Sequence, residues 1–147
     1  MPPGDAPPSM VLDASVAVRW VISEEGSEEA AALLERDLSW VAPRLLVTEV
    51  ASALRRKAAE GALDPAVAGH ALDTLLQAVA DGVLRLADDE AIIGHALLLA
   101  LSLRRKVPDC VYLAVAERHG AGLATADSQL ARMARSRGVQ VLQIPHA

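Results

Sequence analysis

The chain has 147 residues, the length of one ordinary domain, which can bury a core without disulfides or a structural metal. Its composition is 52% hydrophobic with two Trp, one Tyr and no Phe, so the core must consist mainly of Leu, Val and Ala. The presence of one cysteine excludes a disulfide framework and a cysteine-based zinc site, and a net charge of −5 argues against nucleic-acid binding through bulk charge.

The first residues, 1–9, are rich in proline and predict a disordered leader, followed by one domain over residues 10–145. The leader has neither a basic start nor an apolar centre, so it does not resemble a secretory signal peptide. The longest uncharged apolar stretch, residues 91–103, is too short to span a bilayer. We therefore expect a cytoplasmic protein.

Predicted strands and helices alternate along the rest of the chain. Apolar periodicity, capping residues and Gly or Pro stops delimit the helices, and short aliphatic runs between them predict strands. In chain order we expect a strand at 10–12, helices at 13–21 and 27–38, a strand at 40–41, helices at 44–59 and 65–80, a strand at 83–86, helices at 88–105 and 109–118, a strand at 122–125, a helix at 128–137 and a strand at 139–144. This alternation is typical of an α/β fold, here a three-layer sandwich with a central parallel sheet.

Four acidic residues are expected near one edge of this sheet. Asp13 follows the first strand, Asp127 follows the strand at 122–125, and Asp109 begins the helix that leads into that strand. Glu49 borders the apolar stripe of its helix, where a partly buried carboxylate needs a partner. Ligands bind beyond the carboxyl ends of parallel strands, and a group of carboxylates there requires cations. Hard oxygen ligands favour Mg²⁺ or Mn²⁺.

Helix capping is an alternative explanation for Asp13, Asp109 and Asp127, because Asp is among the best N-cap residues. Capping explains neither why the three lie at one sheet edge nor why Glu49 borders the core. The two roles are also compatible, since a capping Asp keeps one oxygen free.

Four blocks of sequence around these acids resemble those of PIN-domain ribonucleases, in particular the VapC toxins of type II toxin–antitoxin systems. The blocks follow one another in the family's order and cover nearly the whole chain from Met10 onward. They are VLDASVAVRW at 11–20, APRLLVTEVASALRR at 42–56, PDCVYLAVAE at 108–117 and GAGLATADSQL at 120–130.

The resemblance implies an Mg²⁺- or Mn²⁺-dependent endoribonuclease, in which a metal-activated water attacks an RNA phosphodiester. It also implies a homodimer and a small antitoxin protein that covers the active site. The sequence matches the catalytic acidic positions at Asp13, Glu49, Asp109 and Asp127, and we expect Asp13, Asp109 and Asp127 to bind metal. Glu49 is expected either to bind metal or to orient the water as a base. Two hydroxyl residues match positions that hold these carboxylates in place, Ser15 and Thr125.

Other functions fit the sequence less well. A haloacid-dehalogenase phosphatase needs a second Asp where this chain has Ser15, and a response-regulator receiver needs its acidic strand in mid-chain. A non-catalytic PIN-like module that binds RNA or protein remains the alternative, although all four acidic positions are intact. Three basic clusters are either phosphate contacts or solvated helix ends: 55–57, 104–106 and 132–137.

Overall fold

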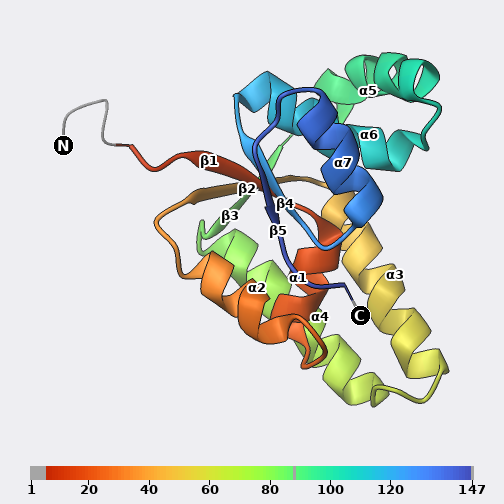
Figure 1. The fold of residues 1–147 in the computed structure, drawn as a ribbon. Helices are drawn as coiled ribbons and strands as arrows, with labels where there is room; N and C mark the ends of the chain where they lie inside the picture. The colour runs from red at the N-terminus through yellow and green to blue at the C-terminus, as the bar shows by residue number, and fades with distance from the viewer. Residues whose placement is uncertain (1–5, 88, 147) are drawn as a thin grey trace.

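The computed structural model describes residues 6–87 and 89–146, and its strands and helices alternate as expected (Figure 1). In chain order the elements are β1 (Ser9–Leu12), α1 (Ala14–Val21), α2 (Ser27–Leu34), β2 (Ser39–Pro43), α3 (Leu45–Ala59), α4 (Pro65–Ala80), β3 (Leu84–Ala87), α5 (Asp89–Leu103), α6 (Val107–His119), β4 (Gly122–Thr125), α7 (Ser128–Ser136) and β5 (Val141–Gln143).

The five strands form one parallel sheet in the order β3-β2-β1-β4-β5. The chain moves outward from β1 to β3, then crosses back and adds β4 on the other side of β1. The order therefore reverses between β1 and β4, and open parallel sheets bind their ligands beyond the carboxyl ends of the strands at such a point. Asp13 and Asp127 follow these two strands.

Helices cover both faces of the sheet, which confirms the predicted sandwich. Helices α1 to α4 lie on one side, α6 and α7 lie on the other, and α5 packs mainly against α6 (Figure 1). The three central strands, β1, β2 and β4, are buried on both faces, and seven successive residues of α6, Cys110–Ala116, are buried as well. This explains why the first part of α6 lacks the polar face of a surface helix.

Several predicted boundaries differ from the structure. Helix α2 ends at Leu34 rather than residue 38, because β2 must begin at Ser39 to pair with Ser9 in β1. Helix α6 begins at Val107 rather than Asp109, because a proline is tolerated in the first turn of a helix, where its missing N–H has no partner to lose. Helices α5 and α7 end earlier than predicted, at Leu103 rather than residue 105 and at Ser136 rather than residue 137, as is common where helices fray. Strand β4 has the predicted bounds, and β5 is shorter than the predicted 139–144.

Two predictions concern residues outside the described part. Residues 1–5 of the predicted leader and Asp88, where we placed the start of the fifth helix, lie outside it. Within the described part, β1 begins at Ser9, and the Pro8 carbonyl accepts a hydrogen bond from the Ser39 amide. None of the helices in that part is long and apolar enough to cross a membrane.

Candidate active site

A pocket of about 620 Å³ opens beyond the carboxyl ends of β1 and β4. The four predicted acidic residues, Asp13, Glu49, Asp109 and Asp127, all line it, although they come from four different parts of the chain. Ser15 also lines the pocket, while Thr125 is fully buried beneath it. The structure thus brings together residues that are up to 114 positions apart, since Asp13 and Asp127 share one wall.

Asp13 is the most buried of these acids, with 7% of its surface exposed. Its Oδ2 accepts hydrogen bonds from the hydroxyls of Ser15, at 2.5 Å, and Thr125, at 2.8 Å. These hydroxyls are oriented in turn, because Ser15 Oγ accepts from the Ala126 amide and Thr125 Oγ1 from the Asp127 amide, both at 2.9 Å. The ends of β1 and β4 are therefore joined by a polar network that fixes the Asp13 carboxylate.

Burial raises the pKa of Asp13 above its ordinary value of 3.8, and the negative charge of Asp127 raises that pKa as well. The hydrogen bonds from Ser15 and Thr125 act in the opposite direction without cancelling the rise. Keeping Asp13 ionised in the folded protein therefore costs free energy, which a nearby cation would offset.

The raised pKa predicts how the stability of the metal-free protein depends on pH. The folded state binds the Asp13 proton more tightly than the unfolded state, so this contribution to stability is complete below pH 3.8 and is lost as the pH rises through the folded pKa. We expect the melting temperature of the wild type in EDTA to rise relative to that of Asp13→Asn when the pH is lowered from about 7.5 to about 5. A constant difference between the two melting curves would contradict the assignment.

Glu49 faces the same pocket from α3 and has a partner that the sequence did not indicate. The buried Tyr112 of α6 donates its hydroxyl proton to Glu49 Oε1 at 2.5 Å. Burial raises the pKa of Glu49, and the charges of Asp13 and Asp109 raise it further, against the effect of the Tyr112 hydrogen bond. Burial also raises the pKa of Tyr112, which therefore remains a hydrogen-bond donor at neutral pH.

Asp127 is the N-cap of α7, and its Oδ1 accepts hydrogen bonds from the amides of Gln129 and Leu130. Asp13 occupies the N-cap position of α1 but forms no side-chain capping bond. Asp109 lies in the first turn of α6, where the N-cap is Lys106. Capping therefore accounts for Asp127 alone, and there it uses only one of the two carboxylate oxygens.

A second hollow of about 430 Å³ shares Asp109 and Asp127 with the pocket and is lined by Arg104, Arg105 and Lys106. These three residues form the turn between α5 and α6, where Arg104 adopts the left-handed conformation at φ 56°. Arg105 lies 3.4 Å from the Asp109 carboxylate. The predicted basic cluster at 104–106 is thus a neighbour of the acidic residues in space.

The donor set of the pocket suits a hard cation, because the four acidic residues offer only carboxylate oxygens. Within residues 6–87 and 89–146, however, no group of three or more His, Cys, Asp or Glu side chains is close enough to form a ready-made metal site. Such an open arrangement fits Mg²⁺, which usually keeps several waters and is bound directly by only one or two carboxylates.

Comparison with known proteins agrees with the topology. The sequence matches the family model for the PIN domain over residues 10–136, and no curated protein matches it significantly. Protein PAE2754 from Pyrobaculum aerophilum has a similar structure, with a TM-score of 0.70 and 21% identity over 93% of this chain and 87% of that chain.

Two structures of complexes also contain a similar chain. One is VapBC2 from Rickettsia felis bound to a DNA fragment from their promoter, with a TM-score of 0.62 and 12% identity over 92% of this chain and 98% of that chain. The other is FitAcB from Neisseria gonorrhoeae, with a TM-score of 0.56 and 17% identity over 91% and 96%. At these identities the structures establish a shared fold. PIN domains are generally nucleases. Because the family model covers most of the chain and the fold agrees with it, this protein belongs to the PIN domain family.

Proposed function

We propose that the protein is an Mg²⁺- or Mn²⁺-dependent endoribonuclease and the toxin of a toxin–antitoxin pair. The observation that carries the proposal is the convergence of Asp13, Glu49, Asp109 and Asp127 in one pocket at the reversal point of the sheet. When bound, a divalent ion supplies Lewis-acid stabilisation of the charge that develops at phosphorus and lowers the pKa of a coordinated water. We assign its binding to Asp13, Asp109 and Asp127, some of which would reach the ion through its waters rather than directly.

The other residues of the site support these carboxylates. The hydroxyls of Ser15 and Thr125 hold the Asp13 carboxylate in one orientation. Little free energy is therefore needed to reorient this carboxylate when a cation binds. Tyr112 holds Glu49 in place through a hydrogen bond. The pKa of Glu49 is raised toward neutral pH, which suits this carboxylate to accept a proton from water. The turn at 104–106 offers cations to the phosphates of a bound strand.

The test is cleavage of matched RNA and DNA oligonucleotides, labelled at one end, by the purified protein with Mg²⁺ or Mn²⁺. We expect cleavage inside the RNA, no cleavage in EDTA, and slower or no cleavage of the DNA. Binding of RNA without cleavage under all metal conditions would instead favour a non-catalytic module.

The toxin role predicts a phenotype. Expression of the wild-type chain alone should arrest growth of its host, and coexpression of a small protein encoded beside it should restore growth. The Asp13→Asn variant should be harmless, because we expect it to lose most of its nuclease activity. Harmless overexpression of a wild-type protein that is active in vitro would contradict the toxin role. We expect this activity in the cytoplasm, where RNA is available.

We also propose that the protein is a homodimer, and the surface of α5 supports this. One side of α5 packs on α6, while its other side exposes Ile93, Leu97, Leu98 and Leu101, of which Leu98 is 70% and Leu101 is 69% exposed. A contiguous apolar face of this kind is typical of a protein interface.

Replacement of Leu98 and Leu101 together by Glu should convert the dimer to a monomer, measured by light scattering after size-exclusion chromatography. The matched control is Val67→Glu, because Val67 is 49% exposed on the distant helix α4. An unchanged mass for the double variant would place the interface elsewhere.

A further inference from the structure

We propose that Lys57, Arg56 and Arg19 form a phosphate-binding subsite for a neighbouring nucleotide of the RNA strand, and that the Glu24 carboxylate occupies this subsite until a strand displaces it. This inference rests on the proposed function, because it concerns the same pocket. Glu24 would thus be an intramolecular competitor of the substrate.

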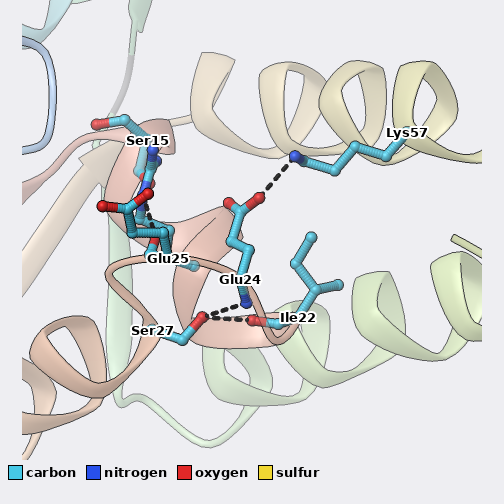
Figure 2. A network of polar contacts seen from close by, with 7 residues as sticks. Ser15, Ile22, Glu24, Glu25, Ser27 and Lys57 are labelled. Atoms are coloured by element: carbon cyan, nitrogen blue, oxygen red, sulfur yellow. Dashed lines mark hydrogen bonds and ion pairs between the residues drawn. The ribbon is translucent and has the colours of Figure 1, made fainter. Parts of the chain in front are cut away.

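Glu24 and Lys57 form an ion pair on one wall of the pocket, between the loop after α1 and helix α3. Lys57 extends from α3 toward the loop after α1, and its Nζ lies 2.6 Å from Glu24 Oε2 (Figure 2). Both residues line the pocket that contains the four acids, and so does the exposed Arg56. A lysine ammonium binds carboxylate and phosphate oxygens through the same charge-assisted hydrogen bonds. The Glu24 carboxylate therefore stands where a phosphate oxygen can bind.

The ion pair is accessible to a solute. The side chain of Lys57 is 27% exposed and that of Glu24 is 17% exposed. Ion pairs that remain in contact with solvent contribute little net stability, so a phosphate can compete with the carboxylate. Exchange requires only rotation of the Glu24 side chain, because its backbone is held independently of Lys57.

Hydrogen bonds with the side chains of Ser27 and Arg19 hold that backbone. Ser27 Oγ accepts a hydrogen bond from the Glu24 amide and donates one to the Ile22 carbonyl, which closes the loop between α1 and α2 (Figure 2). Arg19 Nε donates to the Glu25 carbonyl at 3.0 Å. Gly26, at φ 89°, allows Arg19 to pass, since a Cβ at that position would lie 2.9 Å from Arg19 Cδ.

Arg19 adds a further positive charge to the wall of the pocket that Glu24, Arg56 and Lys57 line. It is 8% exposed, and its guanidinium also donates to the Ser15 carbonyl. In the part of the chain that the structure describes, Arg19 forms no ion pair. A buried charge without a counterion is unfavourable, and an anion in the adjacent pocket would reduce that cost. The wall is thus suited to an anion even while Glu24 neutralises Lys57.

The test is the equilibrium binding of a fluorescent single-stranded RNA 12-mer to the full-length protein in EDTA, over a range of salt concentrations. Glu24→Gln should bind several-fold more tightly at low salt, because Lys57 no longer has an internal partner, and Lys57→Gln should bind more weakly. The slope of log K against log salt should be steeper by about 0.7 for Glu24→Gln than for Lys57→Gln, as expected for one phosphate contact to a single strand. In the Lys57→Gln background, Glu24→Gln should have little further effect.

Two control variants match the changes in charge. Glu28→Gln removes an exposed carboxylate from the first turn of α2, and Arg55→Gln removes an exposed cation from α3. We expect each to change binding less than the variant that it matches. A gain no larger than that of Glu28→Gln, or a gain that persists without Lys57, would overturn the proposal. So would weaker binding by both Glu24→Gln and Lys57→Gln, because the ion pair would then act only as a structural link.

Two further outcomes are informative. Equal competition by a polyglutamate peptide of the same charge would show a general anion site and overturn the assignment to RNA. Failure of the wild type to cleave RNA with Mg²⁺ would contradict the proposed function, whereas the binding differences in EDTA would still establish the subsite. The two proposals therefore fail in distinguishable ways.

Discussion

Replacement of Asp13 by Asn should lower the rate of RNA cleavage by about 100-fold or more while leaving the fold intact. The Asn side-chain oxygen can still accept the hydrogen bonds from Ser15 and Thr125, so the network between β1 and β4 is preserved. The variant loses the negative charge that holds a cation. Metal catalysis contributes several kcal/mol of transition-state stabilisation, and about 1.4 kcal/mol corresponds to a factor of ten in rate.

The measurement is the single-turnover rate with saturating Mg²⁺, together with circular dichroism and thermal melting of each protein. The matched control is Asp64→Asn, because Asp64 caps α4 outside the pocket and Asn caps a helix about as well. We expect the control to keep the wild-type rate. A fully active, folded Asp13→Asn protein would remove Asp13 from the proposed metal site.

Replacement of Asp127 by Asn should raise the melting temperature in EDTA by a few degrees and abolish most of the stabilisation by Mg²⁺. Asp127 caps α7 through Oδ1, which an Asn oxygen can replace. The substitution removes a charge that destabilises ionised Asp13. A gain of about 1 kcal/mol shifts the melting temperature of a domain of this size by a few degrees.

The same melts with excess Mg²⁺ test whether Asp127 binds the cation. An ion that binds only the folded state at about 100 times its Kd stabilises the protein by about 2.7 kcal/mol. We expect the wild type and Asp64→Asn to gain this stability and Asp127→Asn to gain much less. Equal responses of Asp127→Asn and Asp64→Asn in both conditions would mean that Asp127 serves only as a cap.

The sequence was sufficient to predict the sandwich and the gathering of the four acids. Regular alternation of strands and helices implies a parallel sheet, and residues that follow parallel strands share one edge of it. Asp13 and Asp127 could be placed for that reason, and their strands are neighbours at the reversal point. Glu49 could be assigned to the site because it borders the apolar stripe of its helix, where a partly buried carboxylate needs a partner.

Other parts of the site depend on contacts that no local pattern reveals. Tyr112 lies in a run of buried residues of α6, a pattern that by itself indicates core packing, yet its hydroxyl reaches Glu49 in α3. Arg19 resembles a polar residue on an amphipathic helix, but it is buried against the loop at Glu25. The pairing of Glu24 with Lys57 joins residues 33 positions apart, and its existence depends on how α1 and α3 pack.

The most direct test of the metal-dependent endoribonuclease is the conversion of a circular single-stranded RNA to its linear form. A circle has no ends, so only an endonuclease can open it, and its linear product is resolved on a denaturing gel. We predict that the wild type opens the circle with Mg²⁺ or Mn²⁺, that EDTA stops the reaction, and that Asp13→Asn leaves the circle intact. A circle that survives the folded wild-type protein with either metal, or that opens equally well in EDTA, would contradict the account.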